Sequence, residues 1–414
     1  MLSNKRMVIS VKKIVNTTIL VFLSFIACRT LFTIFPITPV LLGGVVLSLI
    51  VWKRLILPMK VIIPFCLYYG MVFYDFVVLE NQGIQEMLFT SFVASMELAC
   101  LFIIYYFSRY NIYAWKRAAW VMVSFIVWSL LITCFINLLI PGYYRDMYVL
   151  SGMEEDKALR RMYESFGVIS YMMFHMISLL LPFLVFVFKM EKKMKFKCLA
   201  LFCLLFFLYA MFSASITTAL GVGCLAVCAA YIYPHKKSNI GMKIILFFCI
   251  CIFYFFGKEL LIWGLDILQP LAEGSKMYDK ISHIQSGLIY GDQSTLMEGR
   301  NGLYESSWDA FADNLLVGCH ERSRLGGHSF IADRLGYWGM LGVLPLFCFL
   351  FVQLRMPIKF INSRVRPYYY ISLLPCVIMA FLKNIYWFET CYMVFLIIPG
   401  LYMWASDRYF VQCK

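Results

Sequence analysis

Charged residues are scarce in this chain of 414 residues, because Asp, Glu, Lys and Arg together make up only 14% of it. A soluble domain usually carries about a quarter charged residues, so the composition excludes an ordinary soluble enzyme and a disordered chain. Hydrophobic residues make up 62% of the chain, and the mean hydropathy is +0.78. We therefore expect an all-α integral membrane protein, with residues 1–414 forming a single polytopic membrane domain.

Patterns that indicate metal, disulfide or nucleic-acid binding are also missing. Most of the 15 cysteines lie inside apolar runs, where cysteine behaves as a small buried apolar residue. Their spacing matches no zinc site, so the sequence predicts no metal, no other cofactor and no disulfide framework. The net charge of +14 is not gathered into a basic stripe with interleaved aromatic residues, which argues against nucleic acid as a partner.

Long apolar runs predict about twelve membrane-crossing helices, since each crossing needs roughly 20 apolar residues. The predicted spans lie at 13–33, 36–52, 61–79, 87–107, 118–140, 167–188, 197–214, 216–233, 243–263, 337–354, 368–383 and 385–405. The first run is too long for a signal peptide and no small-residue cleavage site follows it, so we expect a retained span.

Lys and Arg concentrate in every second connection between the predicted spans. These connections belong on the cytoplasmic side by the positive-inside rule, which places both termini in the cytoplasm of a multi-pass plasma-membrane protein. The basic segments lie near 5–13, 53–60, 109–117, 189–197, 236–243, 355–366 and 408–414. The net positive charge then reflects topology and attraction to anionic membrane lipids.

Two longer polar segments remain for the external face, a medium loop at 141–166 and a long loop at 257–336. The second half of the medium loop has helical spacing and mixed charge, which predicts a solvated helix between two spans. The alternative is that Arg160 and Arg161 bind an anionic ligand, because a planar guanidinium can bind two phosphate oxygens at once.

The long loop is expected to contain amphipathic helices, one of them starting near Asn301 and ending near Gly318. The predicted apolar face of this helix is formed by Tyr304, Trp308, Phe311 and Leu315. We expect this aromatic face to lie against the membrane bundle.

A cationic cluster precedes the next helix, which is predicted to begin at His328 and Ser329. The cluster consists of His320, Arg322 and Arg324. Ser329 is a good N-cap, so His328 is expected where free backbone N–H groups and the positive helix dipole favour an anion. Histidine can also accept a proton near neutral pH. Structural roles stay open, with His328 as a turn residue and the arginines as solvated charges.

Two further ionisable residues carry weaker signals. His175 lies inside an apolar run, where ionisable residues are functional candidates, although we expect it to bond to a neighbouring helix. Asp333 lies five positions after His328 and so does not share its helical face. Arg334 offers Asp333 a surface partner.

Three stretches resemble the bacterial O-antigen polymerase and ligase family. They are Arg300 followed by Trp308, the sequence NLLVG at 314–318, and GGHSFIADRLGYWGMLG at 326–342. About twelve spans with a long external loop before the last three are also similar to this family. The resemblance implies a metal-free fold similar to C-type glycosyltransferases in the bacterial inner (plasma) membrane.

The resemblance further implies a polymerase of undecaprenyl diphosphate-linked oligosaccharide repeat units, in O-antigen or capsular or exopolysaccharide synthesis. The carrier-linked glycan would be both donor and acceptor, and a flippase and a chain-length regulator would be possible partners. Arg300 would bind the carrier diphosphate and His328 would activate the acceptor hydroxyl. The substrate-binding candidates are Arg324, Arg322, His320, Arg160, Arg161, Ser329 and Trp308.

One position departs from the family pattern. Ile216 stands where family members often have an arginine, so Arg160, Arg161, Arg322 or Arg324 would have to replace that phosphate contact. Two alternatives to the polymerase stay open, a ligase that joins finished glycan to another acceptor and a flippase of the lipid-linked sugar. A transporter often shows internal repeats, and we find no convincing repeat in this sequence.

Overall fold

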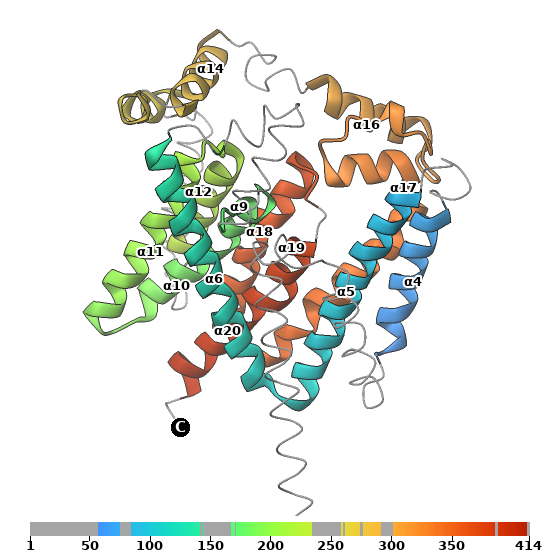
Figure 1. The fold of residues 1–414 in the computed structure, drawn as a ribbon, viewed down its shortest axis with the longest axis horizontal. Helices are drawn as coiled ribbons and strands as arrows, with labels where there is room; N and C mark the ends of the chain where they lie inside the picture. Colours follow the sequence, from blue (N-terminus) through green and yellow to red (C-terminus); the bar gives the residue numbers. More distant parts are fainter. Residues whose placement is uncertain are drawn as a thin grey trace, which may run out of the picture.

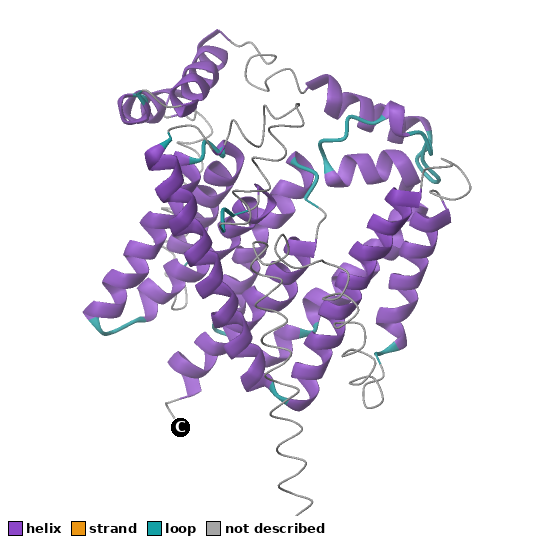
Figure 2. Ribbon diagram, viewed as in Figure 1, coloured by secondary structure: helices purple, strands orange, loops and turns teal. Residues whose placement is uncertain are grey.

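The computed structural model describes residues 57–74, 84–140, 144, 167–169, 171–233, 258–259, 261–273, 276–290, 301–385 and 388–411. All regular structure in these ranges is helical, as predicted (Figure 2). The predicted spans 13–33 and 36–52 and most of 243–263 lie outside the described residues. Arg160, Arg161 and Arg300 also lie outside them.

Helices occupy the third to eighth and the tenth to twelfth predicted spans. They are α4 (Met59–Tyr74), α5 (Ile84–Tyr110), α6 (Ile112–Leu139), α9 (Tyr171–Ile177) with η3 (Ser178–Leu180) and α10 (Leu181–Met190), α11 (Met194–Ser213), α12 (Thr217–Ile232), α17 (Phe330–Arg355), α18 (Arg366–Leu382), and α19 (Phe388–Cys391) with η7 (Tyr392–Ile397) and α20 (Ile398–Ser406). The remaining elements are η4 (Pro270–Ala272), α14 (Lys276–Tyr290), α16 (Asn301–Asp313), η5 (Arg322–Arg324), η6 (Pro357–Phe360) and η8 (Asp407–Val411).

Several of these helices have the length and composition of membrane spans. In the described part of the chain, four helical segments are long and apolar enough to cross a membrane: Ile112–Leu139, Tyr171–Met190, Met194–Ser213 and Phe330–Phe360. α4, α12 and α18 are shorter apolar helices. The described structure is therefore all-helical and compatible with an integral membrane protein, and the number of twelve spans stays a prediction.

The C-terminal helices run through the interior of the bundle. η7 is a π-helix, and its residues are all buried. Trp115 of α6 is fully buried, and its indole N–H donates a hydrogen bond of 2.8 Å to the carbonyl of Leu396. A π-helical turn leaves main-chain groups without their usual α-helical partners, so a side-chain donor of this kind stabilises it.

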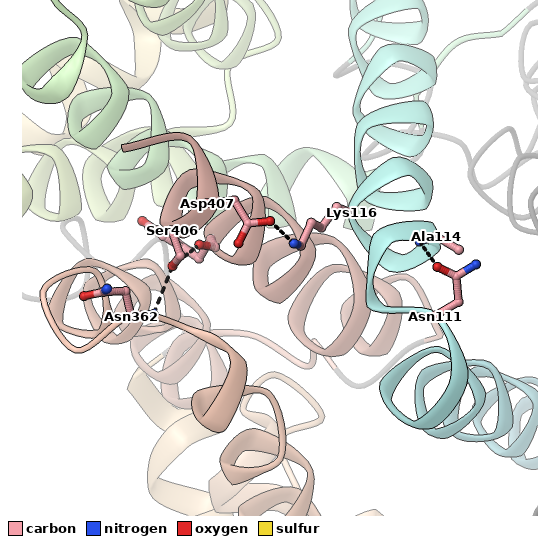
Figure 3. A network of polar contacts seen from close by, with 7 residues as sticks. Asn111, Ala114, Lys116, Asn362, Ser406 and Asp407 are labelled. Carbon is pink, nitrogen blue, oxygen red and sulfur yellow. Dashed lines mark hydrogen bonds and ion pairs between the residues drawn. The ribbon is translucent and has the colours of Figure 1, made fainter. Parts of the chain in front are cut away.

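Basic segments that the charge distribution assigns to one side do share one end of the molecule. Figure 3 shows Lys116, at the start of α6, donating to the carboxylate of Asp407 in η8. Arg408 donates to Glu191, just after α10, over 2.6 Å. These contacts join segments that are far apart in the sequence, and Figure 1 shows the C-terminus at this end. Which membrane face this end occupies stays a prediction.

The helices of the predicted long external loop lie at the opposite end, where α14 and α16 cover the bundle (Figure 1). The Lys280 ammonium of α14 donates to the carbonyl of Ser215, between α11 and α12, over 3.3 Å. The Tyr304 hydroxyl of α16 donates to the carbonyl of Leu382, at the end of α18, over 2.7 Å. The predicted helical character of this loop is thus confirmed for α14 and α16.

Candidate functional site

Helix α17 contains a sharp break at Gly339. This residue has φ of 64° and ψ of −172°, far from helical values. The break divides α17 into an outer arm (330–338), in which Gly336 approaches Ser307 and Ala310 of α16, and an inner arm (340–355), in which Gly342 approaches Met71 of α4. Since this backbone conformation is nearly confined to glycine, the sequence at 339 determines where the helix turns.

The segment 315–320, here called the inserted segment, fills the break in α17. At an unbroken position the carbonyls of residues 336 and 337 would accept hydrogen bonds from the N–H groups of 340 and 341. Four hydrogen bonds to the inserted segment replace them: Cys319 N–H to Gly336 carbonyl (2.8 Å), His320 N–H to Tyr337 carbonyl (3.1 Å), Met340 N–H to Leu315 carbonyl (2.9 Å) and Leu341 N–H to Leu316 carbonyl (3.0 Å). The loop and the helix are therefore interlocked through their backbones.

Two glycines permit this close approach. A Cβ at Gly318, where φ is +78°, would lie 2.3 Å from the carbonyl oxygen of Tyr337. A Cβ at Gly339 would lie 2.4 Å from the carbonyl carbon of Leu316. The stretches 314–318 and 336–342, which carry part of the family resemblance, thus have a structural role: they join the inserted segment to α17.

Small residues, rather than the predicted aromatic face, pack α16 against the outer arm. Ser307 and Ala310 are buried, and a Cβ at Gly336 would lie 2.7 Å from the Ser307 carbonyl oxygen. Trp308 is 41% exposed and Leu315 is 53% exposed. The expected face therefore packs only in part: Tyr304 reaches the end of α18, whereas Trp308 and Leu315 are exposed, because small side chains let the two helix backbones approach more closely than aromatic rings would.

A buried hydrogen-bond chain holds the turn that carries His328. The Ser307 hydroxyl accepts from the Gly326 N–H group over 2.9 Å and donates to Asp333 Oδ1 over 2.6 Å. The N–H groups on either side of His328, those of Gly327 and Ser329, face the same carboxylate. His328 itself is half-buried in this turn.

Asp333 is therefore not a surface partner of Arg334, as the sequence suggested. Its side chain is buried and bonded to Ser307, whereas the Arg334 guanidinium lies 4.7 Å from the centre of the Trp338 ring. The Arg334 charge still acts on Asp333 from a distance, but its direct contact is this cation–π interaction.

The predicted N-cap at Ser329 is confirmed, and two N–H groups of the first helical turn are bonded to protein atoms. The Ser329 hydroxyl accepts from the Ala332 N–H group over 3.1 Å. The Phe330 N–H group donates to the carbonyl of Lys383, just after α18, over 3.1 Å. Protein groups therefore already satisfy these two donors, which reduces what the helix start offers to an anion, and the expected anion site stays a prediction.

The cations predicted beside His328 lie on η5 and the inserted segment. Arg322 and Arg324 are both exposed, and the guanidinium of Arg324 is paired with Asp313. The hydrogen bond that Arg324 donates to this carboxylate raises the pKa of Arg324. His320 is exposed, has a positive φ of 52°, and places its ring 5.8 Å from that of Tyr337.

Ile216, where the family often has an arginine, is buried in the turn between α11 and α12. Only 5% of its surface is exposed, and the preceding Ser215 has a positive φ of 55°. The Lys280 ammonium binds the Ser215 carbonyl from α14, so a cation reaches this turn from the external loop. Sequence reasoning missed Lys280, because nothing in the sequence pairs α14 with this turn.

The inserted segment also exposes a contiguous apolar surface beside the inner arm, which we call the apolar rim. Leu315, Leu316, Val317, Met340 and Leu341 are each more than half exposed. Backbone hydrogen bonds join the two halves of this surface. An apolar rim that continues onto a membrane-length helix is typical of contact with lipid.

Searches against family models, curated proteins and solved structures found no match to this chain. The resemblance therefore rests on the residues quoted above. In the described part of the chain, no group of three His, Cys, Asp or Glu side chains could hold a metal ion. The predicted site residues that the structure describes all belong to the unit of α16, η5 and the outer arm: Trp308, His320, Arg322, Arg324, His328 and Ser329.

Proposed function

We propose that this chain is a polysaccharide polymerase that joins undecaprenyl diphosphate-linked oligosaccharide repeat units at the external face of the bacterial plasma membrane. The observation that carries the proposal is the His328 turn. The turn is held by the buried Ser307–Asp333 pair, it follows the exposed arginines of η5 in the sequence, and it opens a helix of membrane length.

The proposed reaction transfers a glycan from one carrier lipid to another. The acceptor hydroxyl oxygen forms a bond to the anomeric carbon of the donor sugar, and the bond from that carbon to the diphosphate oxygen breaks. His328 accepts the hydroxyl proton, so its imidazole must lie within hydrogen-bond distance of the acceptor hydroxyl. The diphosphate leaves with its added negative charge, and Arg300 and Arg322 stabilise that charge. Arg300 is assigned by resemblance alone.

A lipid-linked substrate also needs a site that opens to the membrane. The carrier's long hydrocarbon chain stays in the bilayer while its diphosphate reaches the surface. The apolar rim lies on the same unit as the His328 turn, which supports binding of a substrate of this kind. We propose in addition twelve spans, cytoplasmic termini and a fold similar to the C-type glycosyltransferases.

The test uses a deletion strain complemented with variants of the full chain. Arg300→Ala and His328→Ala should each shorten the polymer to single repeat units while membrane protein levels stay normal. Arg109→Ala and His283→Ala are matched controls, because both side chains are exposed and lie away from the His328 turn. Long polymer from both site variants would contradict the proposal.

The glycans of the deletion strain also separate the polymerase from its alternatives. Single repeats on their final anchor indicate a polymerase, whereas full-length chains left on the carrier indicate a ligase. Repeat units trapped on the cytoplasmic side indicate a flippase and contradict the enzymatic assignment. The ligase shares the same site chemistry, so it is the second candidate.

A further inference from the structure

One ring nitrogen of His175 on α9 is bonded to the protein, and the other is an acceptor to which no described residue donates. The residue is 1% exposed. Its Nδ1 lies 2.9 Å from the carbonyl oxygen of Tyr171, one turn earlier in its own helix. A carbonyl can only accept, so Nδ1 carries the proton and the neutral ring leaves Nε2 with a bare lone pair. Among the described residues, the ring therefore bonds within its own helix and not to the neighbouring helix that the sequence suggested.

No described residue donates a hydrogen bond to this Nε2 atom. Buried polar atoms are nearly always hydrogen-bonded, and an acceptor left without a donor is unfavourable. Since the backbone carbonyl fixes the tautomer, the missing partner must be a donor. A hydroxyl group of a bound ligand has the right chemistry for this position.

Lys383 connects His175 with the turn that carries His328. Its carbonyl accepts from the Phe330 N–H group over 3.1 Å, directly after that turn. Its ammonium charge lies within electrostatic range of the His175 ring. α9 packs against α19 and α12, and η3 packs against α18, so these elements meet beneath the end that carries α14 and α16 (Figure 1). A fixed acceptor and a cation therefore occur together behind the His328 turn.

We infer that His175 and Lys383 form a binding site for a sugar hydroxyl next to a phosphate. Nε2 accepts a hydrogen bond from the hydroxyl, and the ammonium binds a phosphate oxygen. The two groups occur side by side in a glycosyl diphosphate lipid. The inference rests on the proposed function and adds to it two residues that hold the sugar nearest the carrier phosphate.

The experiment measures lipid binding by the full chain in nanodiscs, with native mass spectrometry as the readout. The first probe is undecaprenyl diphosphate, and the second is the carrier-linked repeat unit extracted from the deletion strain. The variants are His175→Leu, His175→Gln and Lys383→Met. The controls are His283→Leu and Lys359→Met, which alter exposed side chains of the same types.

Lys383→Met should weaken binding of both lipids about tenfold or more, because it removes a charged hydrogen bond to phosphate. His175→Leu should weaken binding of the sugar-bearing lipid about tenfold and leave binding of the bare carrier unchanged. His175→Gln should restore much of the loss, because its side-chain oxygen can accept where Nε2 does. Both controls should bind as the wild type does.

Three results would overturn the inference in distinguishable ways. If every variant bound both lipids with wild-type affinity, His175 and Lys383 would not form a binding site, while the proposed function would stay intact. If His175→Leu weakened the binding of both lipids equally, and His175→Gln did not restore it, the role of His175 would be purely structural. A wild-type protein that binds neither lipid would contradict the proposed function as well.

Discussion

Replacing Gly339 by alanine should release the inserted segment from α17. Gly339 has φ of 64° and ψ of −172°, which an alanine adopts only with strain. The added Cβ would lie 2.4 Å from the carbonyl carbon of Leu316 and 2.5 Å from the nitrogen of Val317. Both neighbours are backbone atoms, so no side-chain rotation relieves the clash.

Two contributions set the size of the effect. The backbone conformation costs about 1–3 kcal/mol for a residue other than glycine. Moving the inserted segment also breaks the hydrogen bonds nearest the clash, those donated by Met340 and Leu341, at about 1 kcal/mol each. We therefore expect the Gly339→Ala variant to destabilise the interlocked unit by about 3–5 kcal/mol.

Hydrogen exchange measures this local stability directly. The amides of Cys319, His320, Met340 and Leu341 are bonded across the break, and their exchange should become at least about 100-fold faster. Gly302→Ala is the matched control, because a Cβ there meets nothing within 4 Å and alanine favours a helix by about 0.5–1 kcal/mol. Unchanged exchange in Gly339→Ala would refute the interlock as the source of stability.

Two further substitutions test buried polar groups at the two ends of the molecule. Ser307→Ala leaves the Asp333 carboxylate and the Gly326 N–H group without their shared partner, so thermal unfolding should show a loss of about 2–3 kcal/mol; a loss below about 0.5 kcal/mol would contradict this role. At the other end, burial raises the pKa of Glu191, but hydrogen bonds from backbone N–H groups and Arg408 outweigh it and keep this pKa below its ordinary value of 4.5. A lowered carboxyl pKa contributes stability above the unfolded pKa that is lost as pH falls through the folded pKa. Between about pH 7 and about pH 3 the wild type should therefore lose more stability than Glu191→Gln, and parallel stability curves would disprove the contribution.

Features that depend on a single segment were predictable from the sequence. Each basic connection carries its own positive charge, so the distribution of Lys and Arg predicted which helix ends meet. The contacts of Lys116 with Asp407 and of Arg408 with Glu191 confirm this grouping. The Ser329 cap is equally local, because a hydroxyl at this position bonds an N–H group three residues later.

Features that depend on contacts between segments were not predictable in the same way. The break in α17 is stable because residues about twenty positions earlier supply its hydrogen bonds, and helical periodicity does not report such partners. The packing face of α16 was misjudged for a related reason. Hydrophobicity favoured Trp308, whereas the close approach of Gly336 in the outer arm selected Ser307 and Ala310. His175 was visible as an ionisable residue in an apolar run, but its vacant acceptor depends on the fold.

The same hydrogen bonds that fix the His328 turn also determine where phosphate can bind. The N–H groups of Ala332 and Phe330 are already bonded to Ser329 and Lys383. Arg324 already has a carboxylate partner in Asp313. Under the proposed function, neutralising a diphosphate falls to side chains from different segments, with Arg322 and Lys383 as the candidates. A site assembled in this way depends on the interlock at Gly339, because that contact holds the arginine-bearing loop against the helix that carries the histidine.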